Sequence, residues 1–182
     1  MRYSYFLIIA AFLAGCQTKQ LPISNISQIT PSFEGAEGVD VYAGKRRNGE
    51  TVPDYRGDQL VEIRSFINQK GKKSSHSKKT EFAGARCSVN ASGFDGNVTT
   101  PAKIRVPIYG YQSSELALRC VADGYQPTVQ SFRAINKTKS DRLNSAASTG
   151  LLGVLAITAV NAASDETKHV FLYAPLNVVF EK

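Results

Sequence analysis

Three short segments between Ala85 and Val121 alternate apolar and polar residues, and this period of two limits the fold more than any other feature. The apolar positions are Ala85, Cys87, Val89, Ile104, Val106, Ile108, Leu116, Leu118 and Cys120. Because successive side chains of a strand point to opposite faces, each segment predicts a strand with one buried face. Residues 94–97 and 112–114 are rich in turn-forming types, so we expect turns there. The pattern predicts a mainly β protein, a small antiparallel β-sandwich.

The β pattern continues on both sides of this region. Residues 60–67 fit either strand alternation or one face of a helix, and we favour a strand. Near the C-terminus, Val170 and Leu172 alternate with other residues, and so do Leu176, Val178 and Phe180. This pattern predicts a last strand that is broken at Pro175 and is paired inside the sandwich.

Cys87 and Cys120 both fall on the apolar face of their own strand, so the pattern places two thiols in one core. Nearby thiols on facing positions meet the geometric condition for a disulfide. Closing a loop of about 34 residues would stabilise the fold by roughly 3–4 kcal/mol in the chain-entropy treatment. We expect the disulfide; the alternative is two buried free thiols.

The N-terminus has the parts of an export signal: Arg2, an apolar run over 6–13, and small residues before Cys16. The apolar run is too short to cross about 30 Å of hydrocarbon as a helix. Leu13-Ala14-Gly15-Cys16 resembles the lipobox of bacterial lipoproteins at all four positions. The resemblance implies a signal peptide over 1–15, diacylglycerol on the Cys16 thiol and acylation of its amine. The alternative is an ordinary secreted protein. In Gram-negative lipoproteins an aspartate after the lipidated cysteine favours the inner membrane, so the resemblance, with Gln17 at that position, implies the outer membrane.

Residues 16–32 carry one charge and several polar residues, so we expect the lipidated end and a flexible tether with a reach of about 20–25 Å. The β-domain would then occupy 33–182.

The precursor has a net charge of +7, which suits contact with anionic lipid, wall polymers or an envelope protein. Nucleic acid is not an expected partner, because the protein would lie outside the cytoplasm. A basic segment lies between 70 and 79 and contains Lys70, Lys72, Lys73, Lys78 and Lys79. It is either a solvated hairpin connection or a contact with an anionic surface.

Several residues of this β region resemble the PEGA-type repeat, a small β-sandwich module of surfaces and envelopes. They are Asp95-Gly96, Thr100-Pro101, Ile104, Val106, Leu116, Leu118 and Gly124-Tyr125. The Pro-Glu-Gly-Ala start of that repeat is replaced here by Gly84-Ala85-Arg86-Cys87. The resemblance implies a binding or structural role, and similar lipoproteins carry two cysteines flanking the Thr-Pro element.

An uncharged segment of small and apolar residues, 143–164, precedes the last strand. The spacing of Ala146 and Gly150, and of Thr149 and Gly153, permits the close approach of helix backbones. We therefore expect a small-residue helix, or two half-helices, packed on the sheet. Two alternatives stay open: membrane insertion or helix–helix oligomerisation, including a homo-oligomer, and a simple loop.

No catalytic motif is recognisable. His76 and His169 are the only histidines, and neither has neighbours that suggest a catalytic triad or a metal site. Three tyrosines lie at strand ends: Tyr109, Tyr111 and Tyr125. They suit stacking on sugars or capping of the core, and we favour capping.

We expect no cofactor and no metal. The sequence predicts a non-catalytic, lipid-anchored envelope lipoprotein with a binding or structural role; the alternative is an oligomerising or membrane-active component acting through 143–164.

Overall fold

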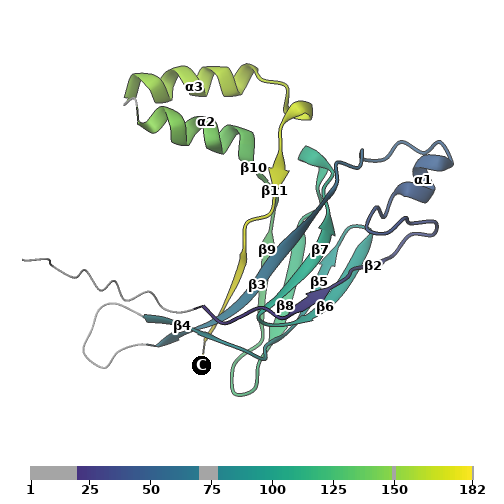
Figure 1. Ribbon diagram of the computed structural model, residues 1–182, viewed down its shortest axis with the longest axis vertical. Helices are drawn as coiled ribbons and strands as arrows, with labels where there is room; N and C mark the ends of the chain where they lie inside the picture. The colour runs from purple at the N-terminus through teal and green to yellow at the C-terminus, as the bar shows by residue number, and fades with distance from the viewer. Residues whose placement is uncertain (1–19, 70–77, 149–150, 182) are drawn as a thin grey trace, which may run out of the picture.

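The computed structural model describes residues 20–69, 78–148 and 151–181. The predicted signal peptide, Cys16, His76 and the basic residues Lys70, Lys72 and Lys73 lie outside these ranges. The described strands form two five-stranded sheets, A and B, that face each other as a sandwich, and a separate two-stranded ribbon leads to a pair of helices (Figure 1). The predicted mainly β fold, with a helical segment before the last strand, is confirmed.

Sheet B contains the most clearly alternating segments. Its strand order is β2-β6-β5-β8-β9, and all its neighbours are antiparallel. The strands are β2 (Thr30–Pro31), β5 (Arg86–Ala91), β6 (Phe94–Thr99), β8 (Leu116–Val121) and β9 (Thr128–Phe132). Cys87, Val89 and Leu118 are buried, as the alternation predicts.

The predicted turn at 94–97 is wrong, because these residues begin β6. The turn lies directly before this strand, at Ser92 and Gly93. Packing explains the glycine inside this strand. A Cβ at Gly96 would lie 2.7 Å from the Cδ1 atom of Ile104, which reaches across from sheet A. Gly96 therefore allows close contact between the sheets, and it does not mark a turn.

Sheet A has the order β1-β7-β3-β12, and β4 pairs with the far end of β3. Its strands are β1 (Asn25–Ser27), β3 (Asp58–Gln69), β4 (Lys78–Phe82), β7 (Ala102–Pro107) and β12 (Leu176–Phe180). The ambiguous segment 60–67 lies inside β3 and is a strand. The pairs β1–β7 and β12–β3 are parallel, so two of the sandwich's strand pairs are not antiparallel.

The last part of the chain keeps the predicted break at Pro175, which separates β11 (Phe171–Leu172) from β12. The register predicted before the break is wrong: Phe171 and Tyr173 are buried, whereas Val170 is 54% exposed. Gln59 sets this register through its side-chain amide. Its Nε2 donates to the Tyr173 carbonyl, and its Oε1 accepts from the Tyr173 N–H, both at 2.8 Å.

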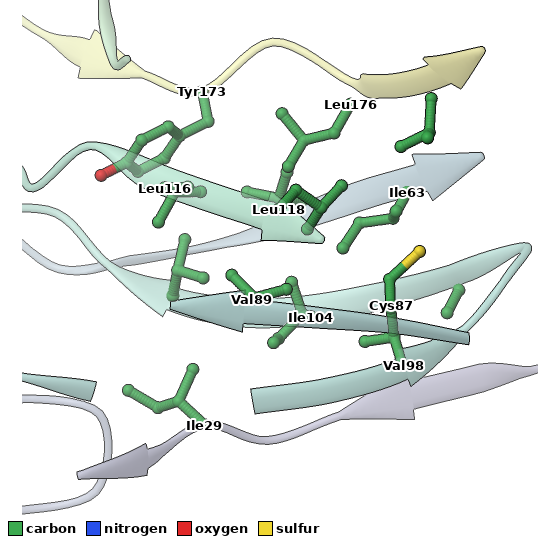
Figure 2. Close-up of a cluster of buried hydrophobic side chains, with 14 of the residues drawn as sticks. Ile29, Ile63, Cys87, Val89, Val98, Ile104, Leu116, Leu118, Tyr173 and Leu176 are labelled. Carbon is green, nitrogen blue, oxygen red and sulfur yellow. The ribbon is translucent and has the colours of Figure 1, made fainter. Parts of the chain in front are cut away.

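The core lies between the two sheets, where apolar side chains from both meet (Figure 2). Ile63, Ile104 and Leu176 come from sheet A and are 0–1% exposed, and Val89 and Leu118 face them from sheet B with the same exposure. Burying each of these side chains stabilises the fold by roughly 1.5–3 kcal/mol relative to leaving it in water. The apolar positions that alternate in the sequence are therefore the ones buried in this one core between the sheets.

The predicted flexible tether over 16–32 is wrong for its described C-terminal half. β1 pairs with β7 and β2 pairs with β6, and Ile29 between them is buried in the core. These strands are short and mostly polar, so backbone pairing, not hydrophobic alternation, holds them in place. The chain therefore joins the sandwich within the segment that the sequence assigned to the tether.

The predicted small-residue helix is two helices, α2 (Lys137–Ala147) and α3 (Leu151–Ala163), which pack against each other as a hairpin. The two-stranded ribbon of β10 (Ile135–Asn136) and β11 carries the hairpin, which stands clear of both sheets (Figure 1). The expectation that it packs on the sheet is wrong, because this ribbon leads the chain away from the sandwich before α2 begins. Within the described ranges, no helix is both long enough and apolar enough to cross a membrane.

Three short helices complete the structure: α1 (Ala43–Arg47), η1 (Gly110–Gln112) and η2 (Glu166–Lys168).

Candidate functional site

Cys87 and Cys120 face each other directly across β5 and β8. Their sulfur atoms are 2.00 Å apart and their Cα atoms 4.0 Å apart, so they form the predicted disulfide. Both residues are buried, at 3% and 0% exposure. The bridge ties β5, the middle strand of sheet B, to its neighbour β8.

A hollow of about 510 Å³ with a mixed polar and apolar lining lies against sheet B, and Cys87 contributes to this lining. Its polar side chains include Ser27, Arg86, Ser88, Asn97, Thr99 and Arg119. The register explains why they gather. Ser88 of β5 pairs with Asn97 of β6 on one side and with Arg119 of β8 on the other, so the three lie in one row across the outer face.

The two arginines give the hollow its charge. Arg86 is 3.5 Å from Asp123, but both side chains are largely exposed, so this pair is weak. In the part of the chain that the structure covers, Arg119 has no ion-pair partner. Guanidinium groups bind phosphate and carboxylate groups through several parallel hydrogen bonds, and the neighbouring hydroxyl and amide groups suit sugars. The hollow is therefore suited to an anionic, hydroxyl-bearing ligand.

A second cluster, which we call the N-terminal clamp, consists of Leu21, Arg64 and Glu81. Arg64 Nη1 donates to Glu81 Oε1 at 2.6 Å and to the Leu21 carbonyl at 3.0 Å. The Leu21 N–H donates in turn to Glu81 Oε2 at 3.0 Å. The Arg64 and Glu81 side chains are only 8% and 10% exposed. The clamp therefore fastens the start of the described chain to β3 and β4.

Glu62 extends the clamp on the same strand. Its carboxylate is 3.2 Å from Lys103 Nζ and 3.3 Å from Arg64 Nε. The hydrogen bond from Lys103 and, after it, the one from Arg64 outweigh partial burial and hold the pKa of Glu62 below its ordinary value of 4.5. The alternating charges Lys103, Glu62, Arg64 and Glu81 thus join three strands of sheet A to the N-terminal segment.

The tyrosines with a predicted capping role occupy three different environments. Tyr109 is 2% exposed; its hydroxyl donates to Asp40 at 3.1 Å and accepts from the Val41 N–H at 3.0 Å. Burial raises the pKa of Tyr109 well above its ordinary value. Tyr125 is partly buried and stacks on Phe82, with ring centroids 5.7 Å apart. Both therefore act in the core, and only Tyr111, at 52% exposure, is available to a ligand.

The predicted basic surface is described only at its edge. Lys78 and Lys79 begin β4, and Lys79 is exposed. His169 is buried, and its Nδ1 is 2.8 Å from Asn136 Nδ2, which links the base of α2 to η2. Among the described residues, no cluster of three or more His, Cys, Asp or Glu side chains is arranged to hold a metal ion.

The structure thus brings Cys87 and Cys120 together beside the hollow and adds two features that the sequence did not reveal, the hollow itself and the N-terminal clamp. The only sequence signal for the clamp is the pair Glu62 and Arg64, two opposite charges inside an otherwise apolar run.

Comparisons of the chain with protein families, curated protein sequences and solved structures find no match.

Proposed function

We propose that this protein is a non-catalytic lipoprotein of the bacterial cell envelope, held by acyl chains on Cys16 in the outer membrane and facing the periplasm. The lipobox-like sequence Leu13-Ala14-Gly15-Cys16, directly after an apolar run, carries the proposal. The disulfide between Cys87 and Cys120 agrees with an oxidising compartment outside the cytoplasm. With Cys16 assigned to lipid, all three cysteines of the chain have a role.

The N-terminal clamp determines how the lipid anchor holds the domain. Leu21 follows Cys16 by only five residues, which span at most about 17 Å when extended. The sandwich is therefore held against the membrane surface and does not swing on a long tether. Lys79 is exposed on β4, the strand that carries Glu81 of the clamp, so anionic head groups near the anchor would attract it.

In this proposal the domain binds an anionic, hydroxyl-bearing component of the envelope through the hollow on sheet B. Arg86 and Arg119 would contact phosphate or carboxylate groups, while Ser88 and Asn97 would contact hydroxyl groups. The PEGA-like pattern of the region supports a binding or structural role of this kind. Ser88 Oγ donates to the Arg119 carbonyl, and the described residues that line the hollow include no histidine or carboxylate to act as a base, which supports binding as its role.

Replacement of the anchoring cysteine tests the location. A Cys16→Ser variant should lose palmitate labelling and leave the membrane fraction or accumulate as unprocessed precursor. A Cys87→Ala/Cys120→Ala variant is the matched control, since it should keep the label. A mature wild-type protein whose mass shows no acyl chains, or a Cys16→Ser variant that is labelled like the wild type, would refute the proposed anchoring.

Binding by the hollow is tested separately with lipopolysaccharide and with purified anionic wall polymer. Arg119→Gln should weaken binding by about tenfold, the loss of one charge-assisted contact. Arg133→Gln changes net charge equally, but this exposed residue pairs with Glu115 away from the hollow, so its binding should stay unchanged. Equal losses in both variants would show that net charge, not the hollow, is responsible.

A further inference from the structure

The α2–α3 hairpin exposes apolar side chains that the rest of the described structure does not cover. α3 has apolar residues around its whole circumference and no charged residue. Leu155 and Val160 are 58% and 51% exposed, and Leu143 of α2 is 39% exposed. A helix that is apolar on all sides is normally surrounded by protein or by lipid. Packing against α2 covers only the side of α3 that carries Asn161, which accepts a hydrogen bond from Arg142.

Polarity changes along the length of the hairpin. The charged residues lie toward the base, next to the ribbon: they are Arg142 and the pairs Lys137–Asp141, Lys139–Glu166 and Lys168–Asp165. Beyond Arg142, the outer part of the hairpin has none up to Asp165. A surface that docks a folded partner from the side would show an apolar stripe beside a polar one. The outer part of the hairpin is uncharged: α3 supplies its apolar surface, and α2 contributes the exposed polar residues Asn144, Ser145 and Ser148. A charged base followed by such a part matches the passage from water into one leaflet of a bilayer.

The hairpin also lies on the side where the proposed anchor would be. In Figure 1, α2 and α3 extend from their ribbon toward the same side of the sandwich as β4 and the purple start of the described chain, but they lie toward the opposite end of the molecule's long axis. The clamp fixes Leu21 to β4, and only four residues separate Leu21 from Cys16. An acylated Cys16 would therefore hold this side of the molecule against the bilayer.

We propose that the outer part of the α2–α3 hairpin enters the acyl layer of the leaflet that holds Cys16, as a second membrane contact. This inference rests on the proposed lipid anchor. α3 has 13 residues, which rise about 20 Å, less than the roughly 30 Å of a hydrocarbon core, so the contact is with one leaflet. Leu155 would lie among acyl chains, and the charged base would stay at head-group level. Val160 is next to Asn161, which accepts a hydrogen bond from Arg142, so it would lie at the boundary between the two.

The chain has no tryptophan, so a single introduced tryptophan reports its own surroundings. Leu155→Trp and Val160→Trp are the probes, because both side chains are exposed and the larger ring needs no repacking. Val129→Trp is the matched control, since Val129 is 66% exposed on the outer face of sheet B. Each full-length acylated protein is reconstituted into vesicles of phosphatidylethanolamine and phosphatidylglycerol, with and without lipids that are brominated on their acyl chains.

Leu155→Trp should show blue-shifted emission and lose at least about half of it to brominated lipid. Val160→Trp should show both effects less strongly because it lies nearer the charged base, and the control should stay water-like and unquenched. Unquenched hairpin probes in a protein of correct acylated mass would overturn this inference and leave the anchor intact. Blue-shifted but unquenched emission together with crosslinks between copies would assign the hairpin to a second copy of the chain instead. A protein without acyl chains would refute the anchor on which the inference rests.

Discussion

Removing one charge of the N-terminal clamp should destabilise the fold far more than removing a charge from the surface. In Glu81→Gln, Arg64 keeps its buried position but loses the carboxylate 2.6 Å away. Because the two side chains are only 8% and 10% exposed, solvent cannot replace the lost partner. Breaking such a buried pair costs roughly 3 kcal/mol. With a urea m-value of about 2 kcal/mol/M for a domain of this size, the midpoint of unfolding should fall by about 1.5 M.

Chemical unfolding by urea, followed by circular dichroism, measures this loss. Glu115→Gln is the matched control, because it breaks the ion pair with Arg133, whose side chain is 83% exposed, and should change the midpoint little. The double variant Arg64→Met/Glu81→Leu should recover most of the lost stability, since no unpaired charge stays buried. Equal midpoints for Glu81→Gln and Glu115→Gln would refute the reasoning that the clamp is an energetically coupled, buried pair.

Three further predictions concern other parts of the sandwich. Reduction of the Cys87–Cys120 bridge, whose ends are 33 positions apart, should lower the free energy of unfolding by about 4 kcal/mol, measured in urea with and without reductant; a loss below about 1 kcal/mol would contradict it. Because the pKa of Glu62 is lowered in the folded protein, its contribution to stability is present above pH 4.5 and is lost as the pH falls through the folded pKa. Lys103→Met should raise the pKa of Glu62, measured by NMR titration. An unchanged pKa in this variant would contradict the assigned cause. Gly93→Ala should cost about 2 kcal/mol in thermal unfolding, because φ is +89° and the new Cβ would lie 2.7 Å from the Phe33 ring; an unchanged melting temperature would contradict this.

Alternation predicted the strands of the core well because one face of each is buried and the other meets water. Val89, Ile104 and Leu118 all point into the same interior, and their polar neighbours point out. The bridge between Cys87 and Cys120 was predictable for the same reason, since both lie on buried faces. Gly96 led to a wrong turn prediction because glycine has two uses: it permits turns, and it permits close contact, here with Ile104.

The features most relevant to function depend on register and on long-range contacts, which a single sequence does not reveal. Ser88 and Arg119 form part of a hollow only because β5 and β8 pair in one particular register. Arg64 and Glu81 meet because β4 folds back along β3. The helices α2 and α3 could be expected from composition, but their position follows from a ribbon with two residues in each strand, which has no clear pattern.

Sheet A takes strands from both ends of the chain: β1 begins at residue 25 and β12 ends at residue 180. The strands of sheet B are complete by residue 132. A chain that emerges N-terminus first can therefore assemble sheet B while its last 50 or so residues are still being delivered. Sheet A must wait, with the edge of β3 unpaired, until the final strand arrives beside it. A premature stop before residue 176 would leave that edge permanently open, so truncated products of this protein should aggregate rather than persist as smaller folded domains.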